Sequence, residues 1–286
     1  MFAFVIGALS MMPYQLTPAP NHTNRSLINF LVANAKIREN SIPIAPPRYQ
    51  QEPAATEKIV SQQTFRKRVT VQIVNGEQRG SGLIIRDRLN RTLVATNRHV
   101  VGDSDTVCVV MYTNKILPGF VHKIGGSKYD LAFIFIPALP PNSPYALSSA
   151  ITDPQNVRFI ISTGYSASTN KFIETSGVTI PILGSIELQS GYSLTYSNQI
   201  EKGMSGGGIF TEDGNLIGLN AIHSDPLWSS DWFEAKGTRL NDDVSRKLDS
   251  VSVGISSQLV QSELNRLKID GTQKIKQISC PSKINN

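Results

Sequence analysis

Short apolar or alternating runs separated by turn residues fill the middle of the chain and constrain its fold most strongly. Residues 68–74 alternate in polarity and end at Asn75-Gly76, a dipeptide typical of tight hairpins. Further runs follow at short intervals, at residues 80–85, 92–96, 106–112, 120–124, 131–136, 157–162, 177–183, 192–196, 207–211 and 216–222. Such regular spacing, with little helix between the runs, predicts an all-β sandwich or barrel.

A cluster of prolines divides this pattern into two halves. Four of them break the chain at positions 137, 140, 141 and 144. With about six strands on each side, we expect two six-stranded antiparallel β-barrels, barrel 1 at about 61–140 and barrel 2 at about 150–255. Ser256 suits an N-cap, and the leucines and valine that follow share one helical face, so a C-terminal helix is predicted over 256–267. Residues 271–286 are polar and indicate a tail.

The first 60 residues have a different character. Residues 1–12 are almost wholly apolar, long enough for the core of a signal peptide and too short for a membrane span, so we expect export to the periplasm or the exterior. No other stretch could span a bilayer. Helical spacing predicts a short helix over 24–38, and prolines predict an extended linker over 42–54. We place the folded domain at 61–270, starting near Ser61.

The charge of the chain is positive but dispersed. The net charge is +6 over 286 residues, and the densest basic cluster is Arg66-Lys67-Arg68. That cluster runs into the first predicted strand, so we interpret it as a solvated strand end. No nucleic-acid-binding motif accompanies it, and we expect no nucleic-acid partner.

Cysteine and histidine are rare. Cys108 lies in an apolar run, which favours a buried unpaired cysteine, although Cys108 and Cys280 could form a disulfide in an oxidising compartment. No group of histidines and cysteines has the spacing of a metal site, so neither a metal nor a cofactor is expected.

The glycine-rich stretch at 201–208 is the first candidate for chemistry. A serine nucleophile needs a nearby base and backbone N–H groups that stabilise a developing oxyanion. Glycines allow the sharp turn that brings these groups together. Ser205 is therefore a candidate nucleophile, and the N–H groups of Gly203 and Ser205 are candidate oxyanion donors. The alternative is an ordinary glycine-rich hairpin with a solvent-exposed serine.

Two residues earlier in the chain can complete this site. His99 follows a predicted strand, and Asp130 opens an apolar strand that is expected to be buried. A buried carboxylate needs hydrogen-bond partners and could orient the histidine. The segment around Ser205 also matches the nucleophile elbow of α/β-hydrolases, but that fold places its histidine after the serine. The order His99, Asp130, Ser205 on an all-β chain is the chymotrypsin-type order.

Five motifs now resemble those of the trypsin-like serine peptidases of chymotrypsin fold. They are Gly80-Ser81-Gly82 with its apolar strand, Thr96-Asn97-Arg98-His99-Val100-Val101, Asp130-Leu131-Ala132, Gly203-Met204-Ser205-Gly206-Gly207 and the hairpin strand 214–220. They are most similar to those of bacterial high-temperature-requirement (Deg-type) proteases, and the resemblance covers about residues 65–267. No PDZ domain of the Deg type is expected after residue 267.

The resemblance implies specific roles. His99 would act as general base and then acid, Asp130 would orient it, and Ser205 would form an acyl-enzyme. Protein or peptide substrates would pair with Asn220-Ala221-Ile222 as an added strand. Gln199 and Ile200 would line the specificity site. Because Gln199 stands where trypsin carries an acid, a preference for Arg or Lys does not carry over.

Other features leave alternatives open. Met204 stands where animal trypsins carry an aspartate, so activation by a new amino terminus is not expected. The long segment 223–246, with Trp228 and Trp232, is interpreted as a self-packed hydrophobic cluster, and the alternative is a lid beside the specificity pocket. A catalytically inactive, peptide-binding relative and a basic nucleic-acid binder are the competing functions.

Overall fold

The computed structural model describes residues 53–123, 128–147, 156–184, 186–224, 231–267 and 280–281, with only the backbone described for 53–59 and for Lys123. The predicted apolar leader and the predicted helix over 24–38 lie outside these residues. The described helices and strands are α2 (Pro53–Val69), β1 (Thr70–Asn75), β2 (Gln78–Arg86), β3 (Thr92–Thr96), α3 (Arg98–Val101), β4 (Thr106–Val110), β5 (Ile116–Lys123), β6 (Ala132–Phe135), β7 (Phe159–Tyr165), β8 (Phe172–Val178), β9 (Tyr192–Tyr196), β10 (Gly208–Thr211), β11 (Leu216–Ile222), α4 (Asp242–Asp249), β12 (Ser252–Ser256) and α5 (Ser257–Arg266).

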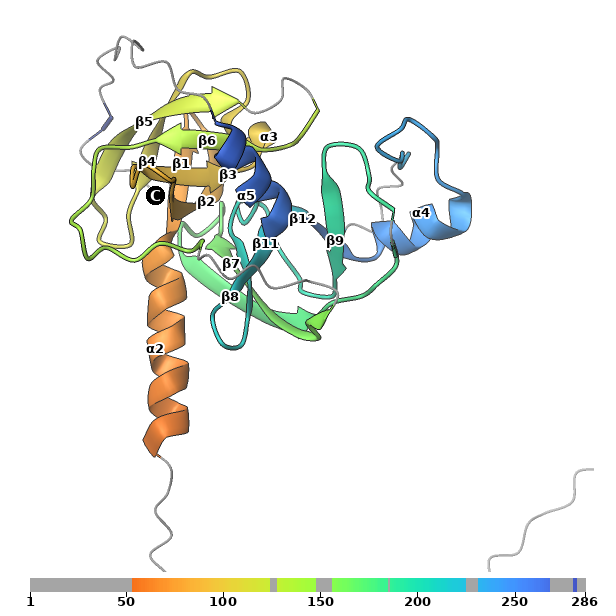
Figure 1. Ribbon diagram of the computed structural model, residues 1–286, viewed down its shortest axis with the longest axis horizontal. Coiled ribbons are helices and arrows are strands. Elements are labelled where there is room, and N and C mark those ends of the chain that lie inside the picture. The colour runs from red at the N-terminus through yellow and green to blue at the C-terminus, as the bar shows by residue number, and fades with distance from the viewer. Residues whose placement is uncertain are drawn as a thin grey trace, which may run out of the picture. The chain divides into compact units, whose positions relative to one another are not determined.

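The first six strands form a closed antiparallel barrel (Figure 1). Its order is β1-β2-β3-β6-β5-β4, and β4 pairs back with β1 through Gln72 opposite Val110. Alternating apolar residues fill the interior, among them Ile73, Val94 and Ile134, all essentially without solvent exposure. Apolar and polar residues alternate along these strands, so each strand has one apolar face. Closing the sheet into a barrel buries all of these faces together.

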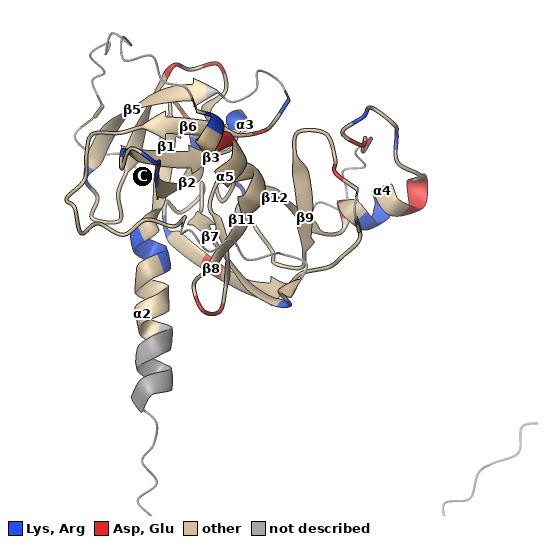
Figure 2. Ribbon diagram, in the orientation of Figure 1, with Lys and Arg blue, Asp and Glu red and all other residues tan. Residues whose placement is uncertain are grey.

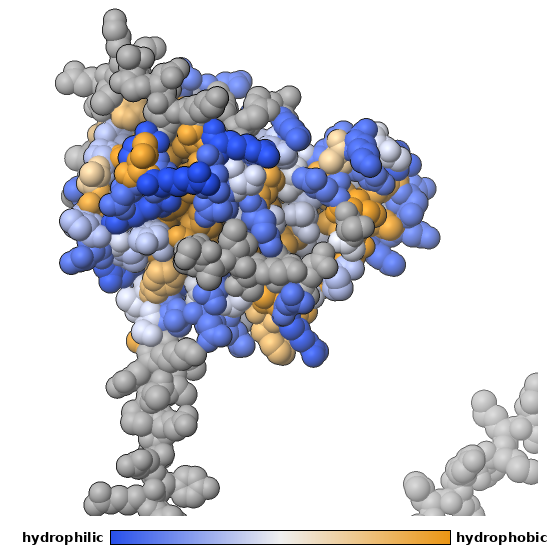
Figure 3. Space-filling view, in the orientation of Figure 1, coloured by the Kyte–Doolittle hydropathy of each residue, from blue (hydrophilic) through white to orange (hydrophobic). Residues whose placement is uncertain are grey.

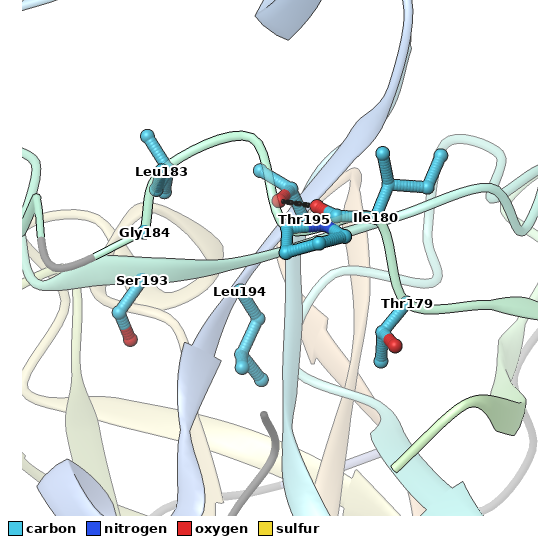
Figure 4. Close-up of a pocket in the computed structure, with 8 residues that line it drawn as sticks. Thr179, Ile180, Leu183, Gly184, Ser193, Leu194 and Thr195 are labelled. Carbon is cyan, nitrogen blue, oxygen red and sulfur yellow. Dashed lines mark hydrogen bonds between the residues drawn. The ribbon is translucent and has the colours of Figure 1, made fainter. Parts of the chain in front are cut away.

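The second half forms a six-stranded antiparallel sheet in the order β8-β7-β10-β11-β12-β9. Its two edge strands meet: Thr179 forms a bridge with Tyr196, and Ile180 N–H donates to Thr195 O over 2.8 Å. Figure 4 shows this seam, where the Thr195 hydroxyl also donates to the Ile180 carbonyl beside a small pocket of about 110 Å³. The expected all-β fold of two six-stranded units is confirmed, with the second unit closed over a short seam only.

A common core joins the two units. Apolar residues of the first barrel, such as Leu83 and Phe133, share one buried cluster with Phe210 and Leu219 of the second sheet. Helix α5 packs on this cluster through Val260 and Leu264, and Figure 1 shows the helix lying across the strands. Ser256 caps it by accepting from Leu259 N–H over 3.3 Å, so the predicted C-terminal helix is confirmed.

The start of the domain differs from the prediction. Residues 53–69 form α2, so the helix begins eight residues before the expected boundary at Ser61 and includes the end of the expected linker. The basic cluster at 66–68 lies in its last turn, where Figure 2 shows it in blue, and is not a strand end. Arg66 is buried and pairs with Glu174 of β8 at 2.8 Å. Basic residues suit this position because a helix C-terminus carries partial negative charge.

Three elements of the second half were placed wrongly or missed. The sequence predicted a strand over 177–183, but strand β8 spans Phe172–Val178. Pro181 cannot donate a backbone hydrogen bond, so it does not suit the interior of a strand. Strand β12 was not predicted, since its five residues run directly into α5 and leave no turn signal. Helix α4 was missed as well, although Asn241 caps it by accepting from Val244 N–H.

The long segment after β11 packs on itself where the structure describes it. Trp232 is buried in a cluster with Leu188, Leu240 and Leu248, and its indole N–H donates to Asp249 over 2.8 Å. This confirms the interpretation of a satellite hydrophobic cluster for Trp232, while Trp228 lies outside the described residues. On the face seen in Figure 3, hydrophilic side chains surround the apolar patches of this region.

The two cysteines are paired. Cys108 of β4 and Cys280 form a disulfide with a Cα–Cα distance of 5.8 Å, so the interpretation of Cys108 as an unpaired buried residue is wrong. The polar character of residues 271–286 hid this attachment of the tail to the first barrel. The apolar run around Cys108 misled because only alternate residues of β4 face the barrel interior, and Cys108 is not among the fully buried ones.

Candidate active site

His99 stands on α3, a single helical turn that follows β3. Asn97 is the N-cap residue of this turn, and its amide donates to Asp130 O over 3.2 Å. The buried Thr96 hydroxyl donates to Ser81 O over 2.7 Å. These bonds fix the turn on the first barrel, while the imidazole remains about half exposed, at 48% of its side chain.

Asp130 lies two residues before the start of β6 and faces this histidine. One carboxylate oxygen accepts the backbone N–H of His99 over 2.9 Å, and the other lies 2.7 Å from the Nδ1 atom of His99. The carboxylate is nearly buried, with 8% of the side chain exposed. Because an ionised carboxylate can only accept, the hydrogen of the imidazole belongs on Nδ1, and Nε2 is left as an acceptor. The histidine thus has the tautomer that a general base requires.

Ser205 lies in the tight turn before β10. Gly206 follows it with φ +84°, and a Cβ atom there would lie 2.1 Å from Ser81 O, so only glycine fits this approach. The Ser205 hydroxyl donates to Ala221 O over 3.0 Å, and among the described contacts it makes no hydrogen bond to His99. A Cβ atom on Gly206 would also lie 2.3 Å from the Thr96 hydroxyl, so the turn of Ser205 lies beside the segment that leads to His99, and the serine hydroxyl is held by a carbonyl of β11.

The carbonyls of the loop 202–205 are each held by the protein. Lys202 O accepts from Ala167 N–H over 2.8 Å, and Met204 O accepts from Gly207 N–H over 3.0 Å. Gly203 O accepts from the Ser81 hydroxyl over 2.7 Å, and Ser205 O accepts from Ser81 N–H over 2.8 Å. The C=O and N–H groups of a trans peptide point in opposite directions. With these carbonyls turned into the protein, the N–H groups of Gly203 and Ser205 have no partner within the described residues.

The predicted substrate-binding residues separate into two groups. Gln199 and Ile200 line a polar pocket of about 490 Å³ together with Met204 and Ser224. Ala221 and Ile222 lie beyond the last pairing of β11 with β10, which ends at Gly208 opposite Leu219. Their strand edge faces the turn that carries Ser205.

Asn220 does not fit the predicted substrate-binding role. Its side chain is fully buried and accepts from the Tyr196 hydroxyl over 2.9 Å. Its backbone groups bond to Gly206 and Gly207. Asn220 instead links β11 to the glycine turn. Each of these bonds lies inside the domain, so these groups are already used and do not bind a substrate.

Two residues of the site were missed from the sequence. Ser81 was noted only as part of a strand motif, yet its hydroxyl accepts from Tyr165 N–H over 2.7 Å while it donates to Gly203 O. Tyr192 donates to Asp130 over 2.9 Å. Ser81 could have been found from its conspicuous position between two glycines, whereas nothing in the sequence near Tyr192 indicates this contact. Among the described residues no cluster of metal-binding side chains occurs, and no helix is long and apolar enough to cross a membrane.

Comparison with known proteins finds a peptidase family and a protease fold to which the chain is similar. Residues 80–219, which include His99, Asp130 and Ser205, match the trypsin-like peptidase domain family. The fold is similar to that in the crystal structure of the Rv3671c protease in its inactive form, with a TM-score of 0.50 and 19% identity over 79% of this chain and 98% of that chain. No curated protein shows significant similarity. Residues 80–219 therefore match a trypsin-like peptidase domain, and the fold is chymotrypsin-like, as the motifs predicted.

Proposed function

We propose that the protein is a serine endopeptidase that hydrolyses peptide bonds through an acyl-enzyme intermediate. The observation that carries this proposal is the pairing of His99 Nδ1 with Asp130 at 2.7 Å beside the turn of Ser205. In this mechanism His99 Nε2 takes the hydroxyl proton of Ser205 as the oxygen attacks the substrate carbonyl. The protonated imidazole, stabilised by Asp130, then gives that proton to the leaving amine. In the second half of the reaction, water attacks the acyl-enzyme while His99 takes its proton. The carboxylic acid product leaves, and the proton returns to Ser205.

The oxyanion of each tetrahedral intermediate would bind the N–H groups of Gly203 and Ser205. Both donors lack a partner in the described part of the molecule, and the neighbouring carbonyls are held away from them. Donors fixed before the reaction need no reorganisation when charge develops, and one such donor is typically worth about 10²–10³ in rate.

Substrate would also affect the serine directly. The Ser205 hydroxyl rests on Ala221 O, a carbonyl on the strand edge where an extended peptide would pair. A peptide N–H that binds the same carbonyl competes with this hydroxyl. The displaced hydroxyl can then turn toward His99 Nε2, as catalytic hydrogen bonds often form only in the substrate complex.

A fluorophosphonate probe tests the proposal, because it reacts only with an activated serine. We expect labelling at Ser205 in the wild type and none in Ser205→Ala or His99→Ala. Ser250→Ala, which removes an exposed hydroxyl bonded to Lys247 O, is the matched control and should be labelled like the wild type. Folded wild-type protein that resists the probe would refute the peptidase and leave the alternative, an inactive peptide-binding relative, which the bond from Ser205 to Ala221 favours.

We further propose that the protein works in an oxidising compartment after export. The disulfide between Cys108 and Cys280 supports this, because such bonds persist mainly in secreted and periplasmic proteins. Fractionation of the producing cells, with mass spectrometry of the pair after alkylation, tests it. A protein found only in the reducing cytosol with both thiols alkylated would overturn it.

A further inference from the structure

The carboxylate of Asp130 receives a donor from each half of the molecule. Its Oδ2 atom is approached by His99 Nδ1 at 2.7 Å from the first barrel and by the Tyr192 hydroxyl at 2.9 Å from the second sheet. Its Oδ1 atom accepts the backbone N–H of His99. Tyr192 is thus the only described side chain outside His99 that holds this nearly buried carboxylate.

The second sheet fixes Tyr192 tightly. It begins β9, where it pairs with Ile255 of β12, and its carbonyl accepts from Leu188 N–H over 3.0 Å. The turn before it has two residues with positive φ, Ser190 at 66° and Gly191 at 78°. A Cβ atom on Gly191 would lie 2.5 Å from a methyl group of Leu259, so glycine allows the turn to approach α5 and Tyr129 closely.

The same turn is bonded to the segment that carries the aspartate. Asp130 N–H donates to Ser190 O over 2.9 Å, and Tyr129 forms a bridge with Ser190. The backbone and the hydroxyl of one turn therefore hold both the main chain and the side chain of Asp130. A pocket of about 350 Å³, lined by Arg98, His99, Asp130 and Tyr192, opens beside the pair.

The hydroxyl is suited to donate to the carboxylate. Burial raises the pKa of Tyr192 well above its usual value, and the negative charge of Asp130 raises the pKa further. The tyrosine therefore keeps its proton at any working pH. A carboxylate that already accepts a neutral donor is held in one orientation and does not rotate away from the imidazole.

We propose that Tyr192 is a positioning residue of the site, whose hydroxyl locks the Asp130 carboxylate in the orientation that directs His99. This inference rests on the proposed serine peptidase function. It assigns to the second sheet a part in orienting the base, in addition to supplying the nucleophile. The expected consequence is that loss of the hydroxyl slows the chemical step and leaves substrate binding nearly unchanged.

Tyr192→Phe tests this by removing one oxygen and keeping the ring. We expect the rate of fluorophosphonate labelling of the full chain, and kcat on a casein-derived fluorogenic peptide, to fall about tenfold with KM nearly unchanged. Tyr145→Phe, which removes an exposed hydroxyl far from the site and keeps the ring that packs on Arg86, should match the wild type.

A double-mutant cycle separates positioning from general support of the fold. In the Asp130→Asn background, Tyr192→Phe should change the residual labelling rate by less than about twofold, because the hydroxyl acts through the carboxylate. An equal loss in both backgrounds, or no loss in either, would overturn the inference. A wild type that is not labelled would instead refute the peptidase itself, so the two failures are distinguishable.

A second measurement covers the case that Tyr192→Phe does not fold. Site-specific 3-fluorotyrosine at position 192 keeps the ring and hydroxyl but makes the hydroxyl a stronger donor, which weakens the bond from His99 to Asp130. The low-field proton resonance of His99 Nδ1–H should then move upfield, and in folded Tyr192→Phe it should move downfield. A resonance that stays unchanged with the fluorinated residue would contradict the proposed role.

Discussion

The two halves of the candidate site are held in different ways. On the first barrel, His99 and Asp130 are bonded to each other through both the backbone and the side chain of the histidine. On the second sheet, the Ser205 hydroxyl is bonded to its own sheet through Ala221 O. The first half therefore already has the geometry that the proposed mechanism needs, whereas in the second half the proposed nucleophile is bonded to the strand edge that we propose binds substrate.

The candidate site depends on contacts between the first barrel and the second sheet. Ser81 of β2 reaches across to Gly203 and Ser205, and Tyr192 of β9 reaches back to Asp130. Each half is thus oriented by a residue of the other. Misalignment of the two units would disturb the proposed oxyanion loop and the proposed base together, although neither half would lose its internal bonds.

The largest expected effect comes from disrupting the pair of His99 and Asp130 on the first barrel. Asp130→Asn keeps the shape of the side chain but cannot accept from both groups of His99, so the wrong imidazole tautomer is favoured. We expect kcat to fall about 10⁴-fold, as for the equivalent change in a serine protease triad. Steady-state kinetics on a peptide substrate measure it. Circular dichroism should remain that of the wild type, and activity within tenfold of it would show that Asp130 does not direct His99.

The next effect concerns the alignment of the units. Arg66 of α2 pairs with Glu174 of β8, with 4% and 15% of the two side chains exposed. Arg66→Ala leaves a nearly buried carboxylate alone, and we expect the free energy of unfolding to fall by about 3–5 kcal/mol in urea denaturation. Arg246→Ala removes an exposed partner of Asp243 and should cost less than about 1 kcal/mol. Equal losses would mean that burial of the pair is irrelevant.

A smaller effect should come from loosening the second half alone. Ser81→Ala removes the hydroxyl that holds Gly203 O and leaves the His99–Asp130 pair intact. Because the oxyanion loop loses one anchor, we expect kcat to fall about 100-fold with KM changed little. Kinetics alongside Ser250→Ala as control measure this. A rise in KM without loss of kcat would place Ser81 in substrate binding.

The smallest expected effect comes from removing the disulfide. Replacing Cys108 and Cys280 together by serine removes the covalent attachment of the tail to β4. We expect thermal denaturation to show a loss of about 2 kcal/mol in stability, with the rate of labelling at Ser205 unchanged at 25 °C. Loss of labelling in the folded variant would connect the disulfide to the site.

Much of the fold follows from local pattern. The first barrel was predicted well because its strands alternate and end at clear turns such as Asn75-Gly76. The second sheet was harder, because β12 passes into α5 without a break and β8 is half-exposed along most of its length. Helix α2 was missed since its basic end was taken for a strand, and its buried pair with Glu174 is a contact 108 residues distant.

Prediction of the candidate site from local sequence patterns has the same limit. His99, Asp130 and Ser205 could be identified because each stands in a short motif of its own. Ser81 and Tyr192 act by reaching another element. The two glycines beside Ser81 mark its position but not its partner, and no local pattern marks Tyr192. Asn220 was assigned to substrate as part of the segment 220–222, which was expected to pair with a peptide backbone. Its backbone groups are instead bonded to Gly206 and Gly207, and its side chain is buried.

The disulfide between Cys108 and Cys280 also closes the chain into a covalent ring. It joins residues 172 positions apart, and the whole second sheet lies inside that ring. A peptidase, including a second copy of this chain, could cut one loop between the two cysteines. The two pieces would then stay joined through the disulfide, as one molecule with a new amino terminus and a new carboxyl terminus. Non-reducing gels would show a nicked protein at full mass, and only reduction would reveal its pieces.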